Sequence, residues 1–204
     1  MITIVDYGLG NVLAFANVYK RLNIEVQTAS TAEELSKASK VILPGVGAFD
    51  HAMQRLDDSG MRAVLDELVL KRKLPVLGVC VGMQMMGNAS DEGKLPGLGW
   101  VNGQVRAFKT SEIAGQLPLP HMGWNDVTPN ASGGLFNQLE REARFYFLHS
   151  FYFECVAQQD VAAVSNYGIS FHCALRAGNI YGVQFHPEKS HHFGAQLLKN
   201  FADL

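Results

Sequence analysis

LPVLGVCVGMQ, residues 74–84, leads from an apolar run straight into a segment with helical spacing. Residues 75–79 are typical of a buried strand, and residues 82–86 favour a helix. Cys80 stands at the junction, with Gly78 and Gly82 two positions to either side, which is the G-x-nucleophile-x-G pattern of a nucleophile elbow. The flanking residues of such a turn must be small, because larger side chains would collide. The stretch therefore predicts a strand that lifts the Cys80 thiol to the carboxyl end of a parallel sheet.

An elbow would also place Cys80 where its reactive form is favoured. The N-terminus of the following helix would point at the sulfur, and a positive helix end favours the thiolate. The backbone N–H of Val81 would be a natural donor to an oxyanion. The alternative is that Cys80 is simply a small buried residue, as free cysteines often are. The elbow pattern by itself leaves both interpretations open.

The residues before the elbow alternate between strand and helix signals. Short apolar runs predict strands at 2–6, 26–29 and 40–43. Helices are expected at 12–22, 49–56 and 61–70. A further helix is expected to begin at a capping box formed by Thr31 and Glu34. This alternation predicts an α/β fold with an open, largely parallel sheet and helices on both faces.

The second half of the sequence reads mainly as strands separated by Gly, Asn and Pro. The expected strands are 99–108, 124–127, 145–154, 162–166, 171–176 and 180–185. A last helix is expected at 193–201. No linker rich in Pro, Gly or Ser separates the halves, so we expect one domain over 1–204, with the later strands added antiparallel to the same sheet.

A second cluster of reactive residues follows the apolar strand 180–185, in the stretch QFHPEKS (184–190). Residues two apart on an extended segment face the same way, so His186 and Glu188 should project together. A carboxylate beside an imidazole fixes its tautomer and stabilises its protonated form, which is the task of the third group of a catalytic triad. The pattern predicts Cys80 as nucleophile, His186 as base and Glu188 as its orienting group.

Two other interpretations of QFHPEKS stay open at this point. His186, Glu188, His191 and His192 carry metal-binding groups, although their spacing fits no familiar zinc pattern. The stretch could also be a surface loop without chemistry. A similar alternative exists for the first residues, DYGLGN, which superficially resemble a dinucleotide-binding loop but lack its third glycine.

Composition restricts the function further. The chain has 204 residues, 48% of them hydrophobic and 18% charged, with a net charge of −2. This balance offers no basic surface for nucleic acid or an anionic membrane. The first residues do not read as a signal peptide, and no apolar run reaches the roughly 18 residues of a membrane span. The three widely spaced cysteines argue against disulfides and favour a reducing cytoplasm.

Six motifs together resemble the class I, triad-type glutamine amidotransferases. They are DYGLGN at the start, LPGVGAF (43–49), GVCVGMQ (78–84), PHMGWN (120–125), YFLHSF (146–151) and YGVQFHPEKS (181–190). Within that family, PGVG and HMGWN match the glutaminase subunits of imidazole glycerol phosphate synthases. The resemblance implies a flavodoxin-like fold and hydrolysis of glutamine by Cys80, His186 and Glu188, with no cofactor and no metal.

The resemblance also implies roles for further positions. PGVG (44–47) would be an oxyanion-hole element whose glycines let a peptide flip toward the oxyanion. The implied oxyanion residues are Val46, Gly47 and Val81. The implied glutamine-binding residues are Gly47, Gln84, Ser150 and Phe151. The residues implied to face a partner are Asn11, Trp124, Tyr146 and Lys189.

The implied partner is a (β/α)₈ cyclase subunit, which would use the ammonia to make imidazole glycerol phosphate and aminoimidazole carboxamide ribonucleotide in histidine biosynthesis. Two alternatives remain. The tail EKSHHFGAQLLKNF is similar to relatives that supply ammonia to sugar amidotransferases of surface polysaccharides. A stand-alone thiol hydrolase would share the elbow but would not need PGVG, HMGWN and YFLHS together.

Overall fold

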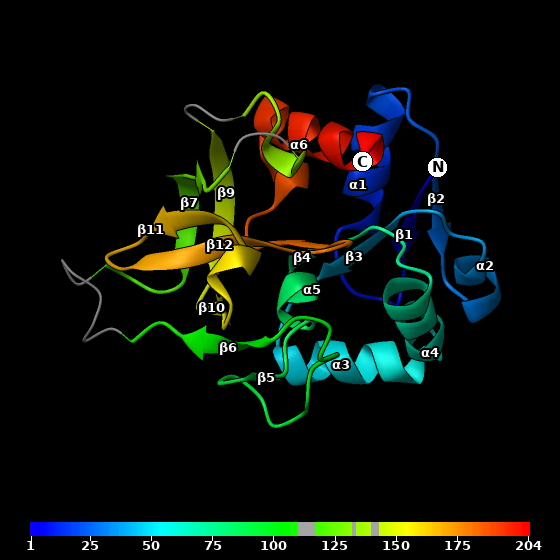
Figure 1. The fold of residues 1–204 in the computed structure, drawn as a ribbon, viewed down its shortest axis with the longest axis horizontal. Helices are drawn as coiled ribbons and strands as arrows, with labels where there is room; N and C mark the ends of the chain where they lie inside the picture. Colours follow the sequence, from blue (N-terminus) through cyan, green and yellow to red (C-terminus); the bar gives the residue numbers. More distant parts are fainter. Residues whose placement is uncertain (110–116, 132–133, 140–142) are drawn as a thin grey trace.

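An eight-stranded mixed sheet forms the centre of the protein in the computed structural model, which describes residues 1–109, 117–131, 134–139 and 143–204 (Figure 1). In spatial order its strands are β2 (Val26–Ala29), β1 (Ile2–Val5), β3 (Val41–Gly45), β4 (Val76–Cys80), β13 (Ile180–Val183), β12 (Ser170–Ala177), β11 (Val161–Asn166) and β8 (Thr128–Pro129). The strands from β2 to β13 are parallel, and those beyond β13 are antiparallel. The predicted α/β class with an open mixed sheet is confirmed.

Helices cover both faces of this sheet (Figure 1). On one face lie α1 (Val12–Arg21) and α6 (His191–Asp203). The other face carries α3 (Phe49–Asp58), α4 (Arg62–Asp66), which continues as a π-helical turn at Glu67–Lys71, and α5 (Val81–Gln84). Every residue of β1, β3, β4 and β13 is buried, because a strand between two helical layers has no solvent face.

The short helix α2 (Ala32–Ser36) begins with part of the predicted capping box. The hydroxyl of Thr31 accepts a hydrogen bond from Glu34 N at 3.2 Å. The carboxylate of Glu34 reaches one residue further back than a capping box requires and accepts from Ser30 N at 2.8 Å. Both bonds still satisfy free N–H groups at the start of the helix.

The expectation that all later strands extend the main sheet is wrong. β5 (Ala89–Ser90), β6 (Gly103–Ala107) and β10 (Phe151–Cys155) form a three-stranded sheet. β7 (His121–Asp126) and β9 (Arg144–His149) form a separate two-stranded ribbon. The expected strand 145–154 is thus broken at Ser150. β13 also differs from expectation, because it runs parallel to β4 rather than antiparallel.

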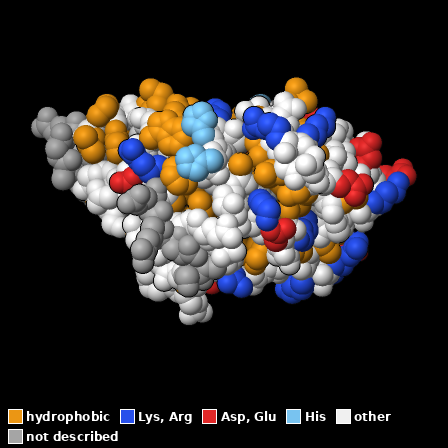
Figure 2. Space-filling model, turned by 90° about the horizontal axis from the view of Figure 1, so that it is seen from above, with side chains coloured by type: hydrophobic (Ala, Val, Ile, Leu, Met, Phe, Trp, Pro, Cys, Tyr) orange, Lys and Arg blue, Asp and Glu red, His pale blue; other side chains and the backbone are white. Residues whose placement is uncertain are grey.

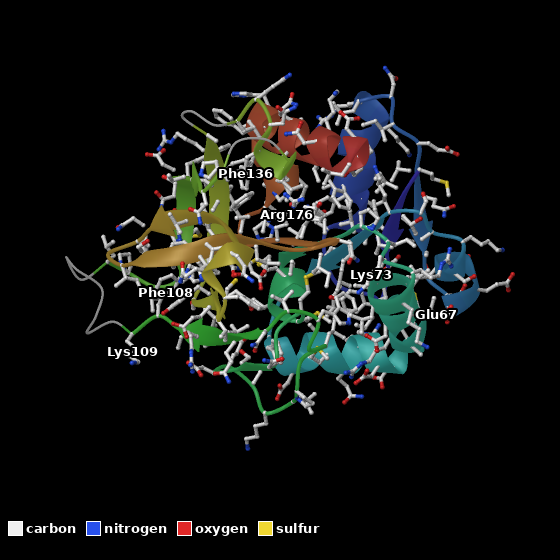
Figure 3. All side chains as sticks on the ribbon, viewed as in Figure 1. Glu67, Lys73, Phe108, Lys109, Phe136 and Arg176 are labelled. Carbon is white, nitrogen blue, oxygen red and sulfur yellow. The ribbon has the colours of Figure 1, made fainter. Side chains whose placement is uncertain are left out.

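Alternating burial explains why these strands stay apart. β9 buries every second residue, and in β7 exposed residues alternate with buried or half-buried ones, so each strand has an exposed face that could not lie in the middle of a covered sheet. Aromatic side chains attach the small sheets to the main one. The ring of Phe108, labelled in Figure 3, lies 5.3 Å from that of Phe171 on β12.

Short 3₁₀ turns complete the described chain at Gly134–Phe136, Gln158–Asp160 and Pro187–Lys189. The first of these lies beside α6, where Figure 3 labels Phe136. Cys80, Cys155 and Cys173 are all buried free thiols, as their spacing predicts. Within the described ranges, no helix has the length and apolar character needed to cross a membrane.

Candidate active site

The predicted elbow is present where β4 passes into α5. Cys80 has φ +56°, a backbone conformation that side chains other than glycine seldom adopt. A Cβ atom added to Gly82 would lie 2.0 Å from the carbonyl oxygen of Leu43, and one added to Gly78 would lie 2.7 Å from that of Gly82. The two glycines are therefore required by close backbone contacts, as the sequence pattern predicts. Because α5 has four residues, its dipole can contribute little at the sulfur.

The second reactive cluster lies beside the elbow because β13 pairs with β4. Val183 is aligned with Val79, so the two strands end together. The chain then continues to His186, whose Nδ1 lies 3.0 Å from Glu188 Oε1. The side chains of His186 and Glu188 are both buried. The other carboxylate oxygen, Oε2, has no hydrogen-bond partner among the described residues, so the bond to His186 is the one interaction that orients Glu188 there.

The electrostatics of this cluster favour an imidazolium. Burial alone would lower the pKa of His186, but a hydrogen bond with Cys80, the bond to Glu188 and the negative charge of both groups outweigh burial and raise this pKa to about 9. Nδ1 faces Glu188, so Nε2 is the nitrogen left for the sulfur. At neutral pH His186 therefore carries a positive charge beside Cys80.

Backbone contacts that the sequence did not predict hold His186 in place. Its N–H donates to Tyr146 O at 2.8 Å. The buried hydroxyl of Ser190 accepts from Tyr146 N at 3.0 Å and donates to His186 O at 2.6 Å. Ser190 thus ties the segment after β13 to β9. Its place at the end of QFHPEKS was the only signal of this role.

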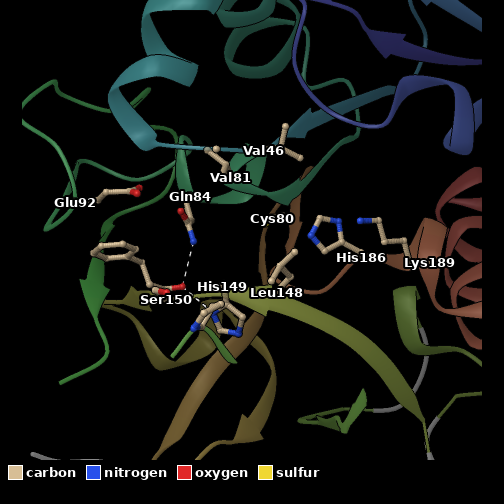
Figure 4. A pocket seen from close by; sticks show the side chains of 13 residues that line it. Val46, Cys80, Val81, Gln84, Glu92, Leu148, His149, Ser150, His186 and Lys189 are labelled. Atoms are coloured by element: carbon tan, nitrogen blue, oxygen red, sulfur yellow. Dashed lines mark hydrogen bonds between the residues drawn. The ribbon is translucent and has the colours of Figure 1, made fainter. Parts of the chain in front are cut away.

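A cavity of about 280 Å³ opens at the elbow (Figure 4). It is lined by Val46, Gly47, Cys80, Val81, Gln84, Glu92, Pro120, Leu148, His149, Ser150, Phe151, His186 and Lys189. All the predicted oxyanion and substrate residues are among them. The cavity suits a small molecule, since it lies near the lower end of the roughly 300–1,000 Å³ range of ligand pockets.

The loop after β3 is anchored at its start and open at its end. The hydroxyl of Tyr7 donates to Pro44 O at 2.7 Å, and a Cβ on Gly10 would lie 2.6 Å from Pro44 Cβ. Gly10 of DYGLGN therefore makes room for this loop. Burial and the nearby Cys80 raise the pKa of Tyr7, which keeps its donor proton in place. Gly47 has φ +83°, which glycine tolerates, and no neighbouring atom lies within 4 Å of its Cβ position.

The far end of the cavity is rich in hydrogen-bond acceptors. The Nε2 of Gln84 donates both its hydrogens, to Phe151 O at 3.2 Å and to Gln184 Oε1 at 3.0 Å, so its Oε1 is the atom left for a ligand. Glu92, which was not predicted, places its carboxylate at the same end and accepts from Phe49 N at 3.0 Å. Its position in an irregular loop carried no periodic signal that could have identified it.

Three of the four residues expected at a partner interface lie together. The rings of Trp124 and Tyr146 are 6.4 Å apart, and the Lys189 ammonium lies 6.0 Å from the Tyr146 ring. Trp124 also stacks on His191, with the ring planes 6° apart. Asn11 is exposed at the start of α1, which contacts the Pro187–Lys189 turn.

The metal alternative finds no support in this geometry. Within the described part of the chain, no three His, Cys, Asp or Glu side chains are placed to hold a metal ion. His186 and Glu188 bind each other, and His191 stacks on Trp124.

Comparison with known proteins identifies related sequences over the full length. The family "Glutamine amidotransferase class-I" matches residues 3–204. The chain is 63% identical over 204 residues to "Imidazole glycerol phosphate synthase subunit HisH" of Bdellovibrio bacteriovorus, and 52% identical to the protein of the same name from Leptospira interrogans, covering 100% of each chain.

Solved structures share the fold at low sequence identity. A crystal structure of a glutamine amidotransferase superposes with a TM-score of 0.75 at 18% identity, covering 100% of this chain and 99% of the other. The structure of PurLQS from Thermotoga maritima gives 0.73 at 15% identity, covering 99% and 97%.

Proposed function

Since this chain belongs to the class-I glutamine amidotransferases, we propose that it hydrolyses glutamine to glutamate and ammonia as the glutaminase subunit of an imidazole glycerol phosphate synthase. The observation that carries the chemistry is the meeting of Cys80, His186 and Glu188 at the ends of two adjacent strands, beside a small cavity. The full-length identity to synthase subunits supports the pathway. The proposal includes the whole chain as one glutaminase domain in the cytoplasm.

The reaction follows from the positions of these groups. The Cys80 thiolate attacks the amide carbon of glutamine, and the resulting oxyanion is stabilised by Val81 N–H and an N–H of the 46–47 loop. His186 gives its proton to the nitrogen, the C–N bond breaks, and ammonia leaves behind a glutamyl thioester. His186 then takes a proton from water, which attacks the thioester and releases glutamate with the thiolate restored. Glu188 keeps His186 oriented throughout.

Substrate recognition uses the acceptor-rich end of the cavity. The α-ammonium group of glutamine carries a positive charge and three donors. The carboxylate of Glu92 and the Oε1 of Gln84 offer it acceptors, and Ser150 and Phe151 also line the cavity. The distance between this end and Cys80 would then select an amide side chain of glutamine length.

An exposed apolar surface beside the cavity supports a protein partner. Met122 faces Leu148 across the β7–β9 ribbon, and Trp124 faces Tyr146. Met122, Trp124 and Leu148 are exposed, although apolar. Figure 2, which looks onto the side carrying α1 and α6, shows hydrophobic side chains gathered beside two adjacent histidines. A contiguous patch of this kind is typical of an interaction site. Leu148 also lines the cavity, so a partner bound here would cover its mouth.

We infer that this partner is the (β/α)₈ cyclase subunit, contacted by Asn11, Trp124, Tyr146 and Lys189. A covered mouth would let ammonia pass to the second active site without protonation in water. The names of the full-length relatives favour this acceptor over a sugar amidotransferase.

The experiment is to combine the purified chain with the cyclase subunit of the same organism and supply glutamine. Imidazole glycerol phosphate should form from the acceptor nucleotide in proportion to glutamate released. If the nitrogen instead appears only in a nucleotide sugar when a sugar amidotransferase is supplied, the pathway assignment is wrong.

A further inference from the structure

We propose that the side-chain amide of Gln184 holds the Cys80 sulfur in its attacking position and stabilises the thiolate. The inference rests on the proposed function, because it assigns Gln184 a role in the same reaction. Gln184 Nε2 lies 3.8 Å from Cys80 Sγ, within reach of an N–H···S hydrogen bond. The side chain is completely buried, one residue beyond the end of β13.

The direction of this hydrogen bond is fixed by a series of neighbouring hydrogen bonds. A carbonyl oxygen can only accept, so Phe151 O must face the nitrogen of Gln84. That nitrogen can only donate, so it must face the oxygen of Gln184. The nitrogen of Gln184 is therefore the atom that points to the sulfur. Turning either amide around would oppose two donors or two acceptors inside the protein.

Phe151 O, the acceptor on which this series of hydrogen bonds depends, is itself held in place. Nδ1 of His149 lies 2.8 Å from Phe151 O, and its Nε2 lies 2.9 Å from Nδ1 of His121. His121 Nε2 in turn lies 3.2 Å from Asn125 Nδ2, a donor. Burial lowers the pKa of His149 to about 3 and that of His121 to about 4, so both rings are neutral at physiological pH. Each neutral ring can donate from Nδ1 and accept at Nε2, as this chain requires.

The sulfur consequently has two different neighbours. His186 supplies a charge that can be lost by titration, and Gln184 supplies a donor that cannot. A hydrogen bond to the charged form of an acid lowers its pKa, so Gln184 favours the thiolate at every pH. Besides His186, after β13, Tyr7, after β1, lies near enough to Cys80 for the charge of Cys80 to raise its pKa. Gln184 is thus a positioning residue for the nucleophile.

The test measures the pH dependence of Cys80 alkylation by iodoacetamide in the full chain, read at the Cys80 peptide by mass spectrometry. Gln184→Met keeps the length of the side chain but removes the donor. We expect its alkylation midpoint to rise by about one pH unit, with kcat for glutamine lowered and KM little changed. Gln184→Glu keeps the oxygen that accepts from Gln84 and places an acid beside the sulfur, so its midpoint should rise as well.

Asn200→Leu is the matched control. Asn200 is a buried amide on α6 that donates to Leu135 O at 2.8 Å and Asn137 O at 2.7 Å, and it does not line the cavity. Its loss should lower the melting temperature without moving the midpoint. If Gln184→Met does not fold, Gln184→Leu, which also removes the donor without adding a charge, decides the question. An unchanged midpoint in a folded Gln184 variant would overturn the proposal. Alkylation needs no glutamine, so this result is independent of the proposed glutaminase activity.

Discussion

At the scale of single residues, Cys80 combines a strained backbone with a paired side chain. A positive φ costs roughly 1–2 kcal/mol for a residue with a Cβ atom, and the close backbone contacts of Gly78 and Gly82 hold it there. The sequence predicted Cys80, His186 and Glu188 because their signals are local: two glycines around one residue, and two residues with the spacing of an extended chain.

Glu92, Ser190 and Gln184 could not be assigned in the same way. Each acts through a contact with a segment distant in sequence: Glu92 with Phe49, Ser190 with Tyr146, and Gln184 with Cys80. Spacing along the chain contains no information about such contacts until the strand order is known.

Replacing the nucleophile separates the two halves of the reaction. Cys80→Ala should reduce glutamine-dependent turnover by at least about 10⁴-fold, because the variant has no group to form the thioester. Turnover driven by added ammonium salts in the complex should persist, since ammonia bypasses the thiol. Both rates can be measured on the same preparation. Residual glutaminase activity near the original level would remove Cys80 from the mechanism.

The two partners of the thiol should differ in importance. His186→Ala should be nearly as damaging as the loss of Cys80, whereas Glu188→Gln should be roughly 10–100-fold milder, because an orienting carboxylate usually costs least to lose. Steady-state kinetics of the two variants test this order. Full activity in Glu188→Gln would show that the 3.0 Å contact does not orient the base.

The raised pKa of His186 predicts a dependence of stability on pH. Its pKa is about 9 in the folded protein against an ordinary value of 6.5, so the folded state binds the proton more tightly. The resulting stabilisation is complete below about pH 6.5 and is lost as pH rises through about 9. Urea denaturation between pH 6 and 10 should therefore reveal a fall in unfolding free energy that His186→Gln lacks. Parallel curves for both proteins would contradict the raised pKa.

At the scale of elements, the first half of the fold was predictable and the second was not. Buried parallel strands and amphipathic helices each have a characteristic pattern of apolar residues in the sequence. The glycines of the elbow mark the junction between the strand and the helix there. The later strands alternate, and alternation is equally compatible with an extended main sheet and with separate small sheets. The break at Ser150 is a particular example, because aromatic and apolar residues stand on both sides of it.

The loop after β3 offers a test at this scale. Gly47→Ala should lower kcat for glutamine hydrolysis in the complex by up to about 10²-fold, because alanine disfavours the positive φ from which we propose that the loop supplies an oxyanion donor. Gly60→Ala is the matched control, since Gly60 has φ +70°, equally open surroundings and a place in the turn between α3 and α4. Both variants should lose similar stability, and only Gly47→Ala should lose activity. Equal kinetics in the two would exclude the loop from catalysis.

At the scale of the whole molecule, we expect the isolated chain to be a poor glutaminase. Its cavity mouth lies beside an apolar surface that a partner would cover, and free hydrolysis would release ammonia into water. Glutamate release should therefore increase from the chain alone to the complex, and again when the acceptor nucleotide is bound. Calorimetric or chromatographic assays of all three states provide the comparison. Equal rates would favour the stand-alone hydrolase.

The place of β13 in the sheet has a consequence for how the protein is made. This strand lies between β4 and β12, yet Gln184, just beyond it, follows Cys80 by 104 residues. On the ribosome, the nucleophile is therefore synthesised long before its base, and the sheet lacks a central strand in the meantime. The edge of β4 has unpaired backbone groups during that interval, which is when a growing chain is most prone to aggregate. The same delay leaves Cys80 without His186 until β13 is inserted, so we expect that a nascent chain does not consume glutamine.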